Sequence, residues 1–230
     1  MKKVRKIVAI AFIAAVMVLS HGTVKAANRT LQIVKEGLRP SDKTLCFLNY
    51  GTTWNYAAFG IEGVEVLTVT SSNESVCKVT LGDSYSANSV HYDYLKAGKA
   101  TIKATYTYKG KTYKSSAKIK VAPFVNPFKS VKVGSKNITK VFDKSKAYIC
   151  GSNCTGYTKV SGKQVLNYTL KNGYKMYQDP SIQTKSNYNK RIYFKKNKKL
   201  DLSKIDYVHF YIKDKEGYTF GFGWGNMKRQ

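Results

Sequence analysis

The chain has 230 residues, of which 43% are hydrophobic and 13% aromatic, and its 40 lysines and arginines against 13 acidic residues give a net charge of +27. The aromatic content excludes a purely disordered basic tail, and the length suits one large or two small domains with their own cores. After residue 26 no apolar run is long enough to span a bilayer, which excludes a membrane-embedded protein.

The first 26 residues predict a secretory signal peptide. Four cations within residues 2–6 precede an uncharged apolar run over residues 7–19, and the segment ends at Ala26. A basic head, a short apolar centre and a cleavage site of this kind direct export. Thirteen residues rise only about 20 Å as a helix, short of the roughly 30 Å hydrocarbon layer, so we expect cleavage rather than anchoring. The mature protein would be secreted, and extracellular or associated with the cell surface.

The charge that remains after cleavage predicts an anionic partner. Removal of residues 1–26 takes away five cations and no acid, so the net charge falls from +27 to +22. This exceeds what solubility requires and favours an anionic membrane surface or an anionic cell-wall polymer such as teichoic acid. Export argues against nucleic acid, and the sequence has neither a paired Cys/His finger nor a basic zipper.

After the signal, apolar and polar residues alternate with the period of a β-strand. The clearest case covers residues 101–121, where Ile102 begins one apolar face and Ile119 belongs to the apolar face of the returning strand. Between them, Lys109-Gly110 is a two-residue turn in which glycine accepts a positive φ. We therefore predict a hairpin with one buried and one solvated face.

Two segments of the first half carry a family resemblance. Residues 69–79 run from a strand into Ser71-Ser72-Asn73, and residues 95–102 read Leu-Lys-Ala-Gly-Lys-Ala-Thr-Ile. With these motifs, residues 30–122 resemble the bacterial immunoglobulin-like group 2 (BIG2) family, most specifically over residues 64–122. The resemblance implies an extracellular β-sandwich of the kind found in surface and adhesion proteins, and it implies no catalytic residues.

Pro123 and Pro127 interrupt the strand pattern and predict a linker over residues 123–127. We therefore expect a BIG2-like domain over residues 28–122 and a second β-sandwich, Ig-like or related, over residues 128–230. The strands expected in the second half cover residues 130–133, 147–150, 164–170, 191–195, 207–213 and 218–224. Short strands without intervening helices predict an all-β chain of two tandem antiparallel β-sandwich (Ig-like) domains.

The cysteines leave several interpretations open. Cys150 and Cys154 are separated by three residues, and an exported pair at this spacing can form a local disulfide, remain as free thiols, or contribute to a metal site with two further ligands. Cys46 and Cys77 lie in apolar strand contexts, where they can pair or remain as small buried side chains.

Six cations lie close together within residues 190–199. They are Lys190, Arg191, Lys195, Lys196, Lys198 and Lys199. In one interpretation they surround a hairpin tip at Asn197 and keep a sheet edge soluble. In the other they form an anion-binding patch.

Residues 218–224 combine a bulky face with a bare one. Tyr218 and Trp224 share the parity of two phenylalanines, whereas Gly221 and Gly223 have the other parity. In one interpretation the bulky face is part of a sandwich core, and the glycines on the opposite face allow other chain segments to come close. Alternatively, Tyr218, Trp224 and tyrosines beside the bare face form a platform for a sugar ring or a peptide.

Catalysis has little support in the sequence. His91 and His209 remain after cleavage, each among strand aromatics. A nucleophilic pair such as Cys154 with His209 is the enzymatic alternative, and no cofactor motif is present. The leading hypothesis is a secreted, non-enzymatic Ig-like protein of the cell surface, acting in adhesion or attachment to anionic wall polymer. Its partner would be that polymer or a surface glycan or protein, and the alternative is a carbohydrate-binding module in the second domain.

Overall fold

The computed structural model describes residues 43–48, 53–56, 64–81, 89–143, 147–150 and 153–226. The predicted signal peptide lies outside these residues. Within them the chain forms 17 strands and one short 3-10 helix, and no α-helix. The predicted all-β fold built of sandwiches is confirmed. Most strand pairs are antiparallel, but three pairs in the described residues are parallel: β1 with β7, β1 with β17, and β11 with β17.

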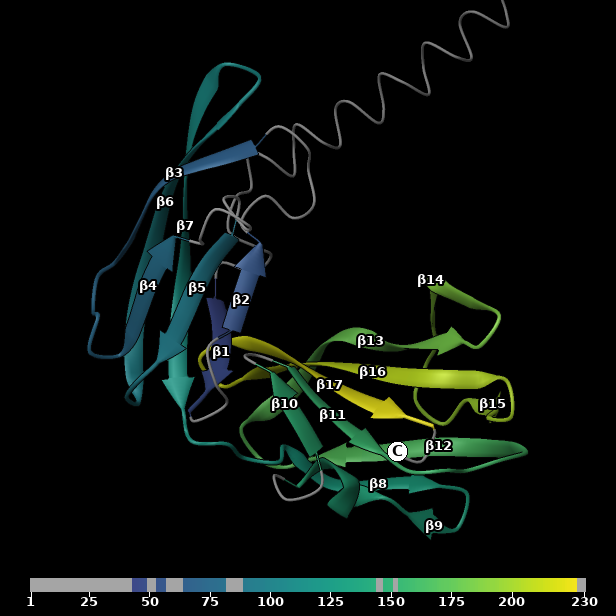
Figure 1. Ribbon diagram of the computed structural model, residues 1–230. Coiled ribbons are helices and arrows are strands. Elements are labelled where there is room, and N and C mark those ends of the chain that lie inside the picture. The colour runs from purple at the N-terminus through teal and green to yellow at the C-terminus, as the bar shows by residue number, and fades with distance from the viewer. Residues whose placement is uncertain are drawn as a thin grey trace, which may run out of the picture.

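The first unit packs two sheets against each other (Figure 1). One sheet has the order β1(Lys43–Phe47)-β7(Lys111–Ala122)-β6(Gly98–Tyr108)-β3(Val64–Ser71). The other has the order β2(Thr53–Tyr56)-β5(Ser89–Tyr94)-β4(Cys77–Leu81). The predicted hairpin is β6–β7, and Lys109 and Gly110 form its turn with φ of 49° and 71°. Ile102 and Ile119 are buried between the sheets, as the alternation predicts.

The Ser71-Ser72-Asn73 segment forms a turn stabilised by side-chain hydrogen bonds. The Ser72 hydroxyl accepts a hydrogen bond from the Thr101 amide at 2.8 Å, and the Ser75 hydroxyl donates to Asn73 Oδ1 at 2.8 Å. Backbone amides of Val76 and Cys77 donate to the Asn73 carbonyl. Side-chain oxygens thus hold the connection from β3 to β4 against β6.

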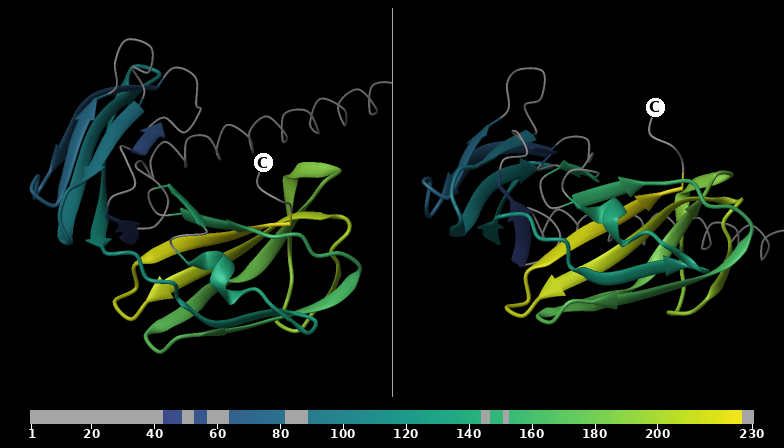
Figure 2. Two further views of the ribbon diagram at one scale, coloured as in Figure 1. Left: turned by 60° about the horizontal axis from the view of Figure 1, so that its bottom comes forward. Right: turned by 90° about the horizontal axis from the view of Figure 1, so that it is seen from below.

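The second unit is also a two-layered sandwich (Figure 2). One layer has the order β14(Asn187–Tyr193)-β13(Tyr174–Thr184)-β16(Ile205–Asp214)-β17(Thr219–Gly225)-β11(Asn153–Tyr157)-β10(Ala147–Cys150). The other has the order β15(Lys199–Asp201)-β12(Lys163–Leu170)-β8(Phe128–Val133)-β9(Lys136–Asn137). The 3-10 helix η1 (Thr139–Phe142) lies against β8 and β11. Aromatic rings fill the core, with the Phe128 ring 4.7 Å from Phe142 and 5.0 Å from Phe210.

Strand β1 belongs to both units. It pairs in parallel with β7 along its whole length and with β17 at Thr44 and Thr219 (Figure 1). Its side chains alternate between the two interiors, because Leu45 and Phe47 pack in the core of the second unit and Cys46 in that of the first. A single strand therefore links the two cores directly.

Residues 123–127, predicted to be a linker, are packed onto the second unit. The Phe124 ring lies 5.3 Å from Phe47. Asn126 is only 8% exposed, and its amide donates to Asp143 Oδ1 at 2.8 Å while its oxygen accepts from the Phe128 amide. The segment is therefore anchored by its own side chains and is not a loose tether.

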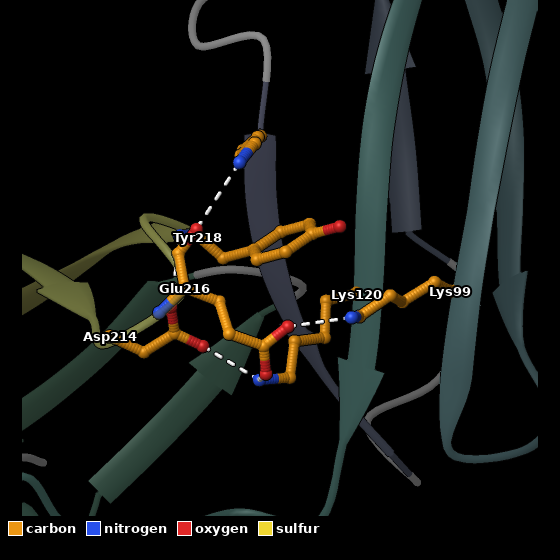
Figure 3. A network of polar contacts seen from close by, with 6 residues as sticks. Lys99, Lys120, Asp214, Glu216 and Tyr218 are labelled. Atoms are coloured by element: carbon orange, nitrogen blue, oxygen red, sulfur yellow. Dashed lines mark hydrogen bonds and ion pairs between the residues drawn. The ribbon is translucent and has the colours of Figure 1, made fainter. Parts of the chain in front are cut away.

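A polar network joins the two units where β1, β6 and β7 meet the turn between β16 and β17 (Figure 3). Lys120 Nζ lies 2.8 Å from Asp214 Oδ2 and 2.6 Å from Glu216 Oε1, and Lys99 Nζ lies 2.6 Å from Glu216 Oε2. The ammonium groups of Lys43, Lys99 and Lys120 surround the Tyr218 ring at 5.6–5.9 Å. Cations of the first unit thus meet acids and one aromatic face of the second.

Candidate ligand-binding face

One face of β16 carries aromatic side chains toward solvent. Tyr207, His209 and Tyr211 alternate along the strand and are partly exposed. The residues between them, Val208, Phe210 and Ile212, are fully buried in the core. The period of two therefore places three rings on the outer face, spaced by two residues each.

Strands β13 and β14 extend this row of rings. Tyr177 and Tyr193 are 43% and 48% exposed, and their rings lie 6.1 and 6.2 Å from Tyr211. The Tyr211 hydroxyl lies 2.8 Å from the hydroxyl of the buried Ser181 and accepts a hydrogen bond from Arg191 Nη1 at 3.1 Å. The central tyrosine is therefore held by polar contacts from β13 and from β14, the next strand in the sheet.

The other end of the row is built around Tyr207. Its ring stacks on His209 at 6.1 Å, and the Tyr157 ring from β11 meets it edge-on at 6.5 Å. His209 Nε2 donates to Gln183 Oε1 at 2.7 Å. Burial, and secondarily the positive charge of Arg191, lowers the pKa of His209 to about 4, so this imidazole is neutral near pH 7.

Strand β17 leaves this face without side chains at three positions. Gly221, Gly223 and Gly225 lie opposite Tyr211, His209 and Tyr207 in the ladder. A Cβ atom at Gly225 would lie 2.5 Å from Tyr157 Cδ1, so glycine is required there for Tyr157 to approach. We call the resulting row the aromatic strip. It consists of Tyr157, Tyr177, Tyr193, Tyr207, His209 and Tyr211.

The predicted platform residues Tyr218 and Trp224 are not part of this surface. Trp224 is fully buried, and Tyr218 is 6% exposed beneath the lysines of the junction. The bulky face of residues 218–224 is the sandwich core, so these two side chains cannot stack on a ligand. The tyrosines that flank the bare glycine face come instead from β11 and β16.

Of the three interpretations left open for Cys150 and Cys154, the structure agrees with the free thiol at Cys154, which is fully buried and forms no disulfide. The β10–β11 register pairs Cys150 with Asn153 and Ile149 with Cys154, which offsets the two cysteines across the hairpin. Burial raises the pKa of Cys154 to about 12. Cys46 and Cys77 are also free and buried, as small apolar residues would be. No three metal-ligating side chains gather within the described ranges.

Cys154 and His209 do not form a nucleophilic pair. In the ladders Cys154 lies opposite the buried Phe222, whereas His209 lies opposite Gly223 on the outer face. The sheet itself separates the thiol from the imidazole. The geometry thus contradicts this cysteine-nucleophile arrangement.

All six clustered cations are exposed, but they do not surround a hairpin tip. Strand β14 pairs with β13 in one layer and β15 pairs with β12 in the other, so the segment around Asn197 crosses between layers. Lys195 Nζ forms an ion pair with Asp179 at 2.7 Å, and Lys196 Nζ lies 5.6 Å from the centroid of the Tyr168 ring. Arg191 alone contacts the aromatic strip among these six, at Tyr211.

Searches against protein-family models and against curated proteins find no match for this chain. Among solved structures, it is similar to fibronectin(III)-like modules of CbhA from Clostridium thermocellum, with 11% identity over 82% of this chain and 91% of that one and a TM-score of 0.31. It is also similar to domains EC1-3 of mouse PcdhgC3, with 8% identity over 83% of this chain and 67% of that one and a TM-score of 0.27.

The N-terminal four Ig domains of Dscam1 isoform 1.9 align at 7% identity over 81% of this chain and 51% of that one, with a TM-score of 0.24. TM-scores this low carry no argument about relationship or function, and the BIG2 resemblance stays a prediction. Among the residues that the structure describes, no helix reaches the length and apolarity that crossing a bilayer requires.

Proposed function

We propose that this chain is an exported, non-enzymatic protein of the cell surface whose second unit binds a glycan on the aromatic strip. The observation that carries the proposal is the row of partly exposed rings on one sheet face, two of them more than 40% exposed. Sugar rings present apolar C–H faces that stack on tyrosine, while hydroxyl and amide groups beside the rings supply hydrogen bonds.

The strip is suited to a chain of sugars rather than to a single small molecule. Its rings follow one another across β14, β13, β16 and β11 and are fixed by contacts to their neighbours. A row of pre-positioned rings binds successive units with little loss of side-chain entropy.

A glycan array followed by calorimetry on the full chain tests the proposal. Replacing Tyr177 or Tyr193 by Ala is expected to weaken binding to the best glycan by about two- to tenfold each, because each removes a stacking ring. Ile192→Ala is the matched control, since Ile192 precedes Tyr193 on β14, is 44% exposed, and pairs with the core residue Ile182.

Circular dichroism must show that all three variants are fully folded at the assay temperature. Glycan binding that ignores both tyrosine substitutions, or that Ile192→Ala weakens equally, contradicts the proposal. An array without hits over neutral and acidic glycans does so as well.

A further inference from the structure

Arg191 is held in place beside the centre of the aromatic strip. Its guanidinium lies 6.0 Å from the centroid of the Tyr211 ring, and its Nη1 donates to the Tyr211 hydroxyl at 3.1 Å. That hydroxyl also contacts the buried Ser181 at 2.8 Å. An exposed side chain of β14 is therefore fixed at the strip.

This guanidinium has unused binding capacity. Across the described ranges no carboxylate lies within ion-pair distance of Arg191, whereas the neighbouring Lys195 forms an ion pair with Asp179. Guanidinium carries five N–H donors in a planar fork that fits a carboxylate with two parallel hydrogen bonds. Its contact with the Tyr211 hydroxyl uses one donor, and the rest of the fork is available to a ligand.

We infer that the glycan on the aromatic strip is acidic, and that Arg191 binds a carboxylate of a sugar ring seated against Tyr177, Tyr193 and Tyr211. This inference rests on the proposed function and names its ligand class. The net charge of +22 expected for the mature chain is complementary to such a polymer. The exposed tyrosine rings favour pyranose units over a polyol phosphate chain, which has no ring face to stack.

Calorimetry with two matched probes tests the inference: an oligogalacturonate, and the same oligosaccharide with its carboxylates methyl-esterified. The full chain should bind the acidic probe at least about tenfold more tightly at fixed ionic strength, since charge-assisted hydrogen bonds to arginine are lost on esterification. Arg191→Gln should abolish this preference, because the acidic probe loses its arginine contact and then binds no more tightly than the ester.

Lys198→Gln is the control for net charge, because Lys198 is an exposed cation whose carbonyl accepts from the Leu166 amide in the other layer. It should retain the preference for the acidic probe. Tyr211→Phe tests positioning, because it keeps the ring but removes the hydroxyl that holds Arg191. It should reduce the preference for the acidic probe over the ester severalfold.

Equal affinity for the two probes, failure to bind the acidic one, or an unchanged preference in Arg191→Gln would overturn the inference. So would competition by a poly-glutamate peptide at the same carboxylate concentration, which would assign the site to acidic chains in general. If the tyrosine variants still weaken binding of a neutral glycan, the proposed function stands without this inference.

Discussion

At the scale of single residues, Glu216 forms ion pairs with both Lys99 and Lys120 at the junction between the units. Hydrogen bonds from Lys120 and then Lys99 lower its pKa to about 2, from an ordinary value of 4.5. The two lysines come from β7 and β6 of the first unit, and Glu216 from the turn after β16 (Figure 3). The carboxylate form therefore favours the joined, folded state.

The junction should weaken in acid because of Glu216. A carboxyl group whose pKa is lower in the folded than in the unfolded state stabilises the fold above pH 4.5, and this contribution is lost as pH falls toward 2. Glu216→Gln should therefore lower the melting temperature at pH 7 and converge with the wild type near pH 2. Thermal unfolding from pH 2 to 7 measures this difference.

Glu65→Gln serves as the control, because Glu65 is an exposed acid of β3 with no ion pair within the described residues. A difference in melting temperature between Glu216→Gln and the wild type that does not change with pH would disprove the link to Glu216 ionisation. The same holds if the control shows an equal change.

At the scale of elements, β1 connects the two hydrophobic cores. Phe47 is 1% exposed, with its ring 5.3 Å from Phe124 and 5.7 Å from Phe220, both in the second unit. Cys46 points into the first unit. Because β-strand side chains alternate, one five-residue strand can fill both interiors only from a position between them.

Phe47→Ala should destabilise the second unit although residue 47 lies in β1, which pairs with β7 of the first unit. Removal of a buried phenylalanine ring costs about 3–5 kcal/mol, and the cavity would open beside Phe124 and Phe220. Denaturant unfolding gives the free-energy change, and hydrogen exchange locates it. Phe47→Leu, which keeps most of the volume, should lose less than about 1.5 kcal/mol. Faster exchange confined to residues 64–122 would refute this assignment.

At the scale of the whole molecule, we expect the excess of cations to attract anionic cell-wall polymer over a longer range than stacking on the aromatic strip can. Binding to purified cell wall should weaken steeply from low salt to about 1 M, where the screening length falls to about 3 Å. Binding that survives at high salt should depend on stacking and be lost in Tyr193→Ala. A cell-wall pull-down with a salt titration, carried out on the wild type and on Tyr193→Ala, separates the electrostatic contribution from the stacking contribution. Binding that ignores salt would remove electrostatic attachment from the proposal.

The strand pattern was predictable wherever alternation was regular and turns were short. The faces of β6 and β7 follow from Ile102 and Ile119, and Lys109-Gly110 marks their turn. Strand β13, with 11 residues, was missed because Pro180 interrupts it and its register shifts on both sides of Gln178. Its pairing with β16 compensates for these interruptions.

The binding face was predictable only in outline. The glycine parity of residues 221–225 indicates a bare face with tyrosines beside it, but it does not identify them. Tyr218 and Trp224 lie on the buried parity, so their placement on a platform was wrong. The signal for Arg191 was a cation cluster, which does not distinguish it from its neighbouring lysines.

Alternating polarity is a local property, so the chain's order of residues is enough to establish β-structure, the faces of its strands and the excess of positive charge. Strand pairing is not local. Lys120 meets Glu216 across 96 positions, and Tyr157 meets Tyr207 because β11 and β16 both flank β17. The junction and the aromatic strip depend on these distant pairings. Alternation of polar and apolar residues does not determine which strands pair, because every strand presents the same kind of hydrogen-bonding edge to its neighbours.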